Sequence, residues 1–273
     1  MPGAGSVKVT ARAALLDALE ALDVHREAVV LIGAQAIYIH TGDAPIALTP
    51  YTKDADLAID ARVLHDDPRI ERAMSAAGFI LDPVANQPGT WLSPSGVPVD
   101  LMVPEALAGS GGRRGARIPP HASNATRRAV GLEASVVDNG IVRIEALDPT
   151  DGRAYDVNVA GPAALLVSKL HKIWERRDDP RRLVDKDAHD VYRLLVACQT
   201  RELAHVLRRL RVDTLAGPVT LQAIDFLEKL FASSVDALGA MMAGRAEIAV
   251  GVPDTVSASA AALATELLEA LIE

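Results

Sequence analysis

The spacing of apolar residues changes near residue 160, and this change limits the possible folds more than any other feature of the chain. Before it, apolar runs as short as β-strands alternate with helical segments. After it, apolar residues recur only at helical spacing, and Gly161 and Pro162 stand where a helix would begin. We therefore predict an α+β domain over residues 1–160 and an all-helical domain over residues 161–273.

The expected elements follow from these patterns and from the glycines and prolines between them. Strands are expected at 28–32, 52–60, 78–81, 90–92, 97–103, 135–137, 141–146 and 154–159. Helices are expected in the first domain at 9–23, 34–40 and 68–77, and in the second at 162–177, 184–198, 200–211, 218–232, 235–243 and 258–272.

Composition excludes several classes of protein. The net charge of −8 argues against a globally basic nucleic-acid binder, although a local basic site remains compatible with it. The single cysteine, Cys198, excludes an internal disulfide and a cysteine-based zinc site. The N-terminus has no apolar signal core and no apolar run is long enough to cross a membrane, so we expect a cytoplasmic protein without membrane contact.

Carboxylates on the predicted strands are the most informative chemical feature. Asp54 and Asp56 are two residues apart, so on a strand their side chains point to the same side. Two adjacent carboxylates need a cation, and oxygen ligands of this kind suit Mg²⁺ or Mn²⁺ held together with substrate phosphates. Asp100 lies within another apolar strand, where an isolated acid would be costly. The alternative is an exposed strand whose acids form surface salt bridges.

A glycine precedes these acids at the end of the first predicted strand. Gly33 and Ala34 follow the apolar run 28–32 and open a helix. A glycine at such a turn lets the backbone approach a phosphate, and the helix N-terminus offers free N–H donors. The sequence therefore predicts nucleotide phosphates near this turn.

The first helix of the second domain presents a row of cations. Lys169, Lys172 and Arg176 are spaced so that they share one helix face. Cations placed in this way repel one another unless an anion lies opposite, such as a triphosphate or a nucleic-acid backbone. The alternative is a solvated basic face whose cations pair with acids that follow nearby in the sequence. Those acids are Glu175, Asp178 and Asp179.

Two further acids, Asp187 and Asp190, lie three residues apart on one face of the next helix. Asp187 also suits the first turn of that helix, where the helix dipole favours an acid. His171 and His189 are predicted to pack or to form hydrogen bonds rather than to bind a metal, because their spacing matches no metal motif.

Residues 106–132 carry five arginines and no acid. Glycine and proline interrupt the first half of this segment, which we interpret as a basic, partly flexible loop. It is the best candidate for contact with an RNA backbone. The arginines concerned are Arg113, Arg114, Arg117, Arg127 and Arg128.

Taken together, these motifs resemble the AbiEii/AbiGii-type nucleotidyltransferase toxins, a group that includes the MenT toxins. The resemblance covers about residues 28–200. Its motifs are Gly33-Ala34-Gln35-Ala36, Tyr51-Thr52-Lys53-Asp54-Ala55-Asp56-Leu57, Lys169 and Lys186-Asp187-x-x-Asp190.

The resemblance implies a DNA polymerase β-like nucleotidyltransferase fold, with a mixed sheet followed by a helical part. It implies that Asp54 and Asp56 hold Mg²⁺ or Mn²⁺, that Lys169 meets the nucleotide phosphates, and that either Asp187 or Asp190 is the acid of the last motif. The remaining expected nucleotide contacts are Gly33, Ala34, Thr52, Lys53 and Lys172.

The reaction implied is transfer of a nucleotide from an NTP, in several members to the 3′ end of tRNA, which stops translation. A cognate antitoxin is the usual partner. From the residues we assign Asp100 to assist Asp54 and Asp56, and Asp100 or a neighbouring acid to take the proton of the acceptor hydroxyl.

Two departures from the family keep other functions open. Many nucleotidyltransferases have Gly-Ser where this chain has Gly33-Ala34, and many AbiEii relatives have an arginine where it has Pro50. The alternatives are transfer to a small molecule or a protein side chain, and a catalytically weak protein of the same fold that binds a nucleotide or a partner.

Overall fold

The computed structural model describes residues 4–42, 54–84, 86–111, 114–248 and 250–273. They divide into two compact units, which are described separately. The first comprises residues 1–35, 50–132 and 139–160, and the second comprises 36–49, 133–138 and 161–273. Two short segments of the predicted first domain thus belong to the helical unit. The division into domains at residues 160 and 161 stays a prediction.

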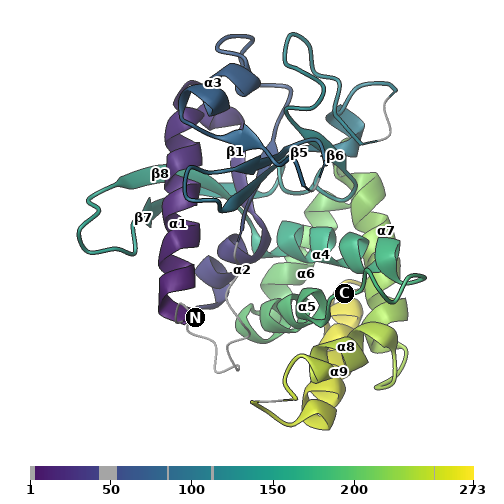
Figure 1. Ribbon diagram of the computed structural model, residues 1–273. Coiled ribbons are helices and arrows are strands. Elements are labelled where there is room, and N and C mark those ends of the chain that lie inside the picture. The colour runs from purple at the N-terminus through teal and green to yellow at the C-terminus, as the bar shows by residue number, and fades with distance from the viewer. Residues whose placement is uncertain (1–3, 43–53, 85, 112–113, 249) are drawn as a thin grey trace. The chain divides into compact units, whose positions relative to one another are not determined.

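A mixed β-sheet forms the first unit (Figure 1). Within the described residues it has eight strands, in the order β3-β4-β5-β2-β1-β8-β7, with β6 paired to β5. The strands are β1 (Val29–Ile32), β2 (Ala55–Ile59), β3 (Ile80–Leu81), β4 (Thr90–Leu92), β5 (Pro98–Pro104), β6 (Arg127–Ala129), β7 (Asn139–Glu145) and β8 (Ala154–Ala160).

The centre of the sheet is apolar because strands β1, β2 and β5 lie between other strands. All four residues of β1 are buried, which explains why its sequence is continuously apolar rather than alternating. Strand β1 runs parallel to β8 and antiparallel to β2, and β2 runs parallel to β5. This arrangement places the predicted acids on two neighbouring central strands.

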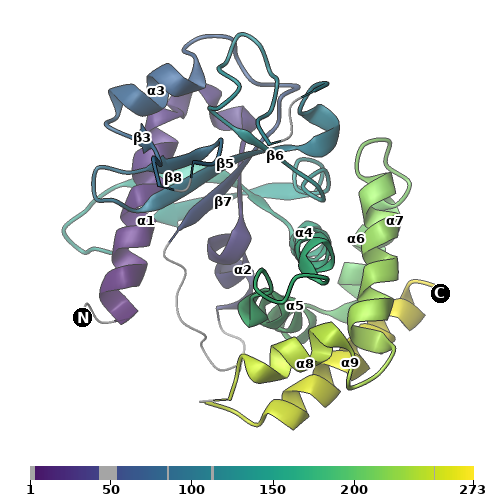
Figure 2. The ribbon, with the colours of Figure 1, turned by 45° about the vertical axis from the view of Figure 1, so that its right-hand side comes forward.

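Helices complete the first unit. Helix α1 (Ala4–Ala21) packs against β2, β5 and β8, and α3 (Ile70–Ala76) packs against α1 (Figures 1 and 2). The buried leucines of α1, such as Leu15 and Leu19, recur at the spacing that predicted this helix. Two short 3₁₀ helices, η1 (Asp23–Ala28) and η2 (Glu105–Leu107), connect the longer elements.

The second unit is helical. Helix α2 (Gly33–Thr41) runs from the first unit into it. The other elements are α4 (Pro162–Arg176), α5 (Asp185–Ala197), α6 (Thr200–Leu210), α7 (Gly217–Leu227), the π-helical turn η3 (Glu228–Ala232), α8 (Leu238–Arg245) and α9 (Pro253–Ala270). Helix α4 packs against α5, α6 and α7, and α5 packs against α8 and α9 (Figure 2).

The predicted fold class, a mixed sheet with helices followed by a helical part, is confirmed. Two local expectations are wrong. Residues 135–137 form a turn instead of a strand, and the chain reverses there because Val137 and Asp138 both donate to the carbonyl of Ala134. The segment 106–132 contains the short strand β6, which the glycines and prolines before it concealed.

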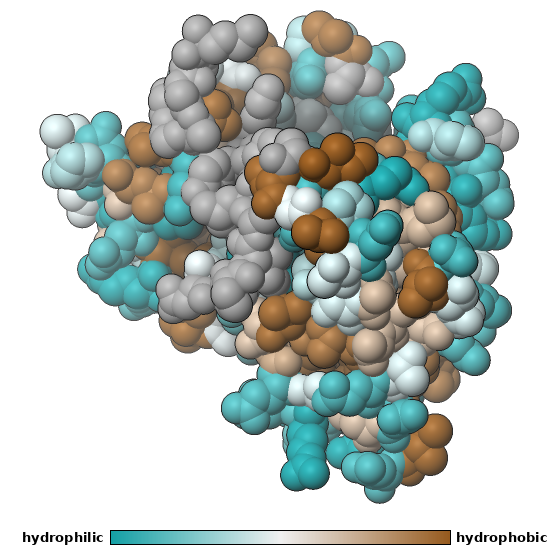
Figure 3. All heavy atoms as spheres, turned by 90° about the horizontal axis from the view of Figure 1, so that it is seen from below, coloured by the Kyte–Doolittle hydropathy of each residue, from teal (hydrophilic) through white to brown (hydrophobic). Residues whose placement is uncertain are grey.

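Hydrophobic residues lie between hydrophilic ones on the face viewed in Figure 3. In the second unit, exposed aliphatic side chains include Ile248, Val250 and Val252, all from the connection between α8 and α9. Such residues are common on protein surfaces, so this connection alone does not indicate a binding site.

Candidate functional site

Asp56 lies at the centre of the sheet, beside the start of a helix. The strand register sets it opposite Ile32 of β1 and Asp100 of β5. Asp54 directly precedes β2, and both aspartates are half-buried. The structure thus places Asp56 and Asp100 in register on neighbouring strands, with Asp54 two residues before Asp56.

Gly33 is required by the position of the Asp56 carboxylate. Its φ of +69° lies in the left-handed region, and a Cβ atom at this position would lie 2.1 Å from Oδ2 of Asp56. The carboxylate therefore occupies the space that any other side chain would fill. This contact is the physical reason for a glycine between the strand and the helix.

Gln35, to which sequence reasoning gave no role, supports Asp54 from helix α2. Its Nε2 donates to the carbonyl of Asp54 at 3.2 Å and lies 3.3 Å from that of Ala11, while its Oε1 accepts from Nε of Arg12 at 3.2 Å. Gln35 is buried. The carbonyl of Asp54 is therefore tied to α1 and α2, which the helical pattern alone did not reveal.

Asp100 is held by two side chains from neighbouring strands. Thr90 Oγ1 donates to its Oδ1 at 2.6 Å, and Nη2 of Arg127 donates to its Oδ2 at 2.8 Å. Sequence reasoning assigned no role to Thr90 and assigned Arg127 to RNA. The register that sets Thr90 opposite Asp100 could not be deduced from a single strand pattern.

The donor chemistry of Asp54 and Asp56 fits a magnesium ion that also binds substrate phosphates, since Mg²⁺ often takes only one or two protein carboxylates. Among the residues that the structure describes, no three acidic, histidine or cysteine side chains form a group that could hold a metal. Asp100 is instead paired with Arg127. The fit to Mg²⁺ therefore rests on Asp54 and Asp56.

In the second unit, Lys169 is enclosed by carboxylates. Its Nζ lies 2.8 Å from Oδ1 of Asp187 and 2.7 Å from Oδ2 of Asp190. The Lys169 side chain is 8% exposed, and those of Asp187 and Asp190 are 7% and 0% exposed. Helix α4 thus supplies the cation and α5 the two acids.

Lys172 and Arg176 also contact Asp187, at the more exposed side of the cluster that Lys169, Asp187 and Asp190 form. Nζ of Lys172 lies 2.9 Å from Oδ1 of Asp187, and Nη1 of Arg176 lies 3.6 Å from its Oδ2. The Lys172 side chain is 41% exposed. The anion expected opposite this row of cations is therefore supplied by the chain itself, and Lys172 is also open to solvent.

The alternative prediction was that Lys169, Lys172 and Arg176 pair with acids that follow nearby in the sequence, and it is wrong. Among the described residues, the nearby acids form ion pairs with other arginines instead. These pairs are Glu175 with Arg182, Asp178 with Arg177, and Asp179 with Arg181.

Ionisation in the cluster is governed by the competition between burial and charge. Burial alone would raise the pKa of the Asp187 carboxyl, but the ammonium groups of Lys169 and Lys172 outweigh burial and hold that pKa well below its usual range. Burial would likewise lower the pKa of Lys169, but Asp187 and Asp190 raise it above its usual range. Asp187 and Lys169 are therefore both charged at neutral pH.

His171 and His189 both form hydrogen bonds, as predicted. Nε2 of His171 donates to the carbonyl of Val219 at 2.8 Å, and burial lowers the pKa of the imidazole. Nε2 of His189 lies 2.8 Å from Oε1 of the buried Glu247.

The predicted RNA-binding arginines fall into different environments. Arg114 and Arg117 are exposed. Arg128 instead holds the loop together, because it donates to Oε1 of Glu105 at 2.9 Å and to the carbonyls of Ala108 and Gly109 at 3.1 Å and 2.6 Å. The loop is thus ordered in part by one of its own arginines.

Three predicted site residues, Thr52, Lys53 and Arg113, lie outside the described residues, as does Pro50. Ala34 is described, and it is buried in the first turn of α2.

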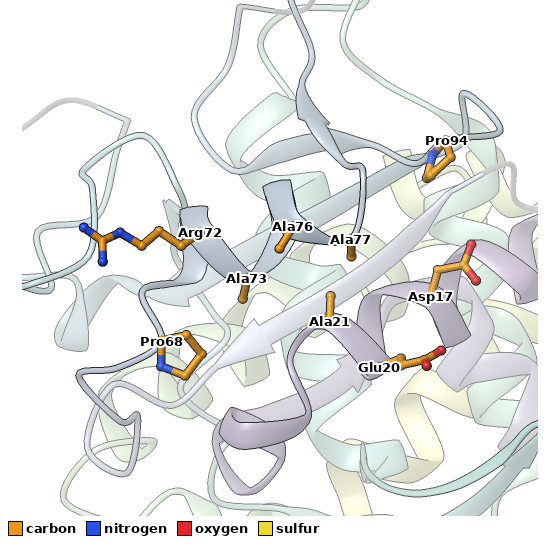
Figure 4. Close-up of a pocket in the computed structure, with 9 residues that line it drawn as sticks. All are labelled: Asp17, Glu20, Ala21, Pro68, Arg72, Ala73, Ala76, Ala77 and Pro94. Atoms are coloured by element: carbon orange, nitrogen blue, oxygen red, sulfur yellow. The ribbon is translucent and has the colours of Figure 1, made fainter.

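A cavity of about 740 Å³ lies between α1 and α3 in the first unit (Figure 4). Alanines of both helices line it, with Asp17 and Glu20 on one side and Arg72 on the other. Asp17 is paired with Arg153 at 2.5 Å. Because the cavity is lined by none of the predicted site residues, it gives no support to their assignment.

Comparison with known proteins identifies one family. A family described as Nucleotidyltransferase matches residues 10–214, three quarters of the chain. No curated protein and no solved structure matched the chain. The described helices include none that is both long and apolar enough to span a lipid bilayer.

Proposed function

Because this chain belongs to the nucleotidyltransferase family, we propose that it transfers a nucleotide from an NTP to the 3′ end of tRNA, as the toxin of a toxin–antitoxin system. The observation that carries the proposal is the Asp56 carboxylate seated against Gly33, two residues from Asp54 and in register with Asp100. Carboxylates at the start of a helix combine the ligands of a divalent cation with N–H donors for phosphate.

The proposed chemistry uses the acids of the first unit. Asp54 and Asp56 would hold Mg²⁺ or Mn²⁺, and the bound cation would supply positive charge to the triphosphate. The acceptor hydroxyl oxygen forms a bond to the α-phosphorus, the bond from that phosphorus to the pyrophosphate oxygen breaks, and Asp100 takes the hydroxyl proton. Gly33 and Ala34 present backbone N–H groups at the start of α2.

The cations of the second unit have separate expected roles. We assign Lys169 to hold Asp187 and Asp190 in place, since its buried ammonium already forms ion pairs with both carboxylates. Lys172 is the better candidate for nucleotide phosphate, because its side chain is 41% exposed while its ammonium contacts Asp187. Its contribution would be to stabilise charge on the departing pyrophosphate.

An RNA acceptor is supported by the acid-free segment 106–132, in which Arg114 and Arg117 are exposed. A tRNA acceptor also implies a cytoplasmic location, and toxicity implies a cognate antitoxin as partner. The second candidate is transfer to a small molecule or a protein side chain. The net charge of −8 requires only that any RNA contact be local.

The test is incubation of the protein with total tRNA and each α-labelled NTP, with and without Mg²⁺. We expect one NTP to label the 3′ end of tRNA, only when Mg²⁺ is present. Reversing the charge of Arg114 and Arg117 to glutamate should abolish this labelling while leaving NTP binding intact. Labelling that survives the charge reversal would contradict the RNA contact, and absence of labelling with every NTP would contradict the tRNA acceptor.

A further inference from the structure

Both oxygens of Asp100 are occupied by side chains that the reaction itself does not require. Thr90 takes Oδ1 and Arg127 takes Oδ2, at 2.6 Å and 2.8 Å. Asp100 is 16% exposed and Arg127 26% exposed, so the ion pair is only partly open to solvent. Each oxygen of Asp100 keeps a second lone pair, but the positive charge of Arg127 beside Oδ2 opposes the binding of a cation to the same carboxylate.

The pairing of strands β6 and β5 places Arg127 near Asp100. Strand β6 runs parallel to β5, with Arg127 opposite Met102. Gly89 permits the close approach, because at its φ of +76° a Cβ atom would lie 2.5 Å from the backbone nitrogen of Arg127. The sheet therefore fixes the backbone of Arg127 within side-chain reach of Asp100, and the rotamer of Arg127 determines whether the two groups are in contact.

Apart from the contact with Asp100, the guanidinium of Arg127 forms only weak hydrogen bonds among the described residues. Nη1 reaches Oε1 of Gln87 at 3.4 Å, a long hydrogen bond, and Nη2 also contacts Sδ of Met102 at 3.0 Å. Phosphate oxygens bind guanidinium more strongly than an amide or a thioether does. A triphosphate therefore competes with Asp100 for the donors of Arg127.

We propose that Arg127 is a positioning residue that withholds Asp100 from the cation held by Asp54 and Asp56, and that nucleotide phosphates draw Arg127 away. The inference rests on the proposed function. Its consequence is that three carboxylates act on one cation only when a nucleotide is bound. Cation and nucleotide therefore bind cooperatively, each raising the affinity for the other.

The test uses Mn²⁺ as the probe, with free Mn²⁺ measured by electron paramagnetic resonance. Each variant is titrated alone and with the α,β-methylene analogues of ATP, GTP, CTP and UTP in turn. In Arg127→Gln, Asp100 is released, so the nucleotide-free affinity should rise about tenfold while the nucleotide-bound affinity stays unchanged. Arg127→Lys keeps the charge and should behave as the wild type.

A second variant should change the nucleotide-bound affinity for Mn²⁺ instead of the nucleotide-free affinity. In Asp100→Asn, the nucleotide-free affinity for Mn²⁺ should stay unchanged, while the nucleotide-bound affinity should fall about tenfold. Arg62→Gln is the matched control, since Arg62 pairs with Asp60 beyond the other end of β2. It should leave both affinities unchanged. If the role of Arg127 were only structural, Arg127→Gln would change the stability of the protein but neither its nucleotide-free nor its nucleotide-bound affinity for Mn²⁺.

The outcomes separate this inference from the proposed function. If Asp56→Asn binds Mn²⁺ as well as the wild type does, the proposed metal site itself is wrong. If Asp56→Asn loses Mn²⁺ but folded Arg127→Gln binds it no more tightly than the wild type, only the role of Arg127 is overturned. If Arg127→Gln does not fold, the Asp100→Asn titration decides, and an unchanged nucleotide-bound affinity overturns the inference.

Discussion

Replacing Lys169 by methionine tests the account of the second unit most sharply. The substitution keeps a linear apolar stem of similar length and removes the ammonium that lies between Asp187 and Asp190. Asp187 retains Lys172 and Arg176 as partners. Within the described residues Asp190 has an ion pair with Lys169 alone, so the substitution leaves its fully buried carboxylate without a counter-ion.

The expected loss of stability is about 3–5 kcal/mol, the range for removing one partner of a buried ion pair. Adding Asp190→Asn removes the stranded charge and should recover a large part of this loss. Lys172→Met is the matched control. Because the Lys172 side chain is 41% exposed, solvent screens its ion pair, and loss of the ammonium should lower the unfolding free energy by no more than about 1 kcal/mol.

Tryptophan fluorescence can report on this unit alone. The chain has two tryptophans, and Trp174 lies on the same helix as Lys169, stacked on Phe226 with ring centroids 4.4 Å apart. Urea unfolding in a Trp91→Phe background therefore follows Trp174. A Lys169→Met variant within about 1 kcal/mol of its parent, or no more destabilised than Lys172→Met, would show that Lys169 does not balance the buried charge of Asp190.

Three further predictions concern the start of α2 and the effect of pH. Gly33→Ala should lower stability by about 1–2 kcal/mol through its left-handed backbone alone and should displace the Asp56 carboxylate, so calorimetry should show Mn²⁺ binding lost in a folded protein. Ala34→Ser restores the hydroxyl found in many nucleotidyltransferases and should tighten NTP binding several-fold in the same calorimetric assay, whereas unchanged affinity would mean that this hydroxyl has no role. Asp187, whose pKa is lowered in the folded state, stabilises the fold above its unfolded pKa of about 4. This stabilisation is lost as the pH falls through the lowered pKa. The unfolding free energy measured in urea below about pH 5 should therefore depend less on pH in Asp187→Asn than in the wild type.

Strand and helix positions were predictable where the pattern follows directly from burial. Strand β1 is wholly buried and its sequence is wholly apolar, so four successive residues identify it. The short strand β6 gives no such signal, because its three residues are half-buried and include two arginines. Only its pairing with β5 makes it a strand, and pairing between distant segments is not encoded in local periodicity.

The candidate site shows the same limit. Spacing alone correctly indicated that the cations of α4 need an anion, but it suggested an external ligand. The structure supplies Asp187 and Asp190 from α5, at a position that depends on how the two helices pack. Arg127 was likewise assigned by composition to RNA, whereas the sheet register brings it to Asp100. Residue type indicated charge, and only tertiary packing determined the partner.

The central claim is that Asp54 and Asp56 carry nucleotide transfer, and the rate of label transfer from an α-labelled NTP by Asp56→Asn tests it most directly. Asp60→Asn, which changes an acid beyond the other end of β2, is the matched control. We expect Asp56→Asn to slow Mg²⁺-dependent transfer by at least about a hundredfold while it remains folded, and Asp60→Asn to retain activity. Transfer by folded Asp56→Asn at the wild-type rate would contradict the account.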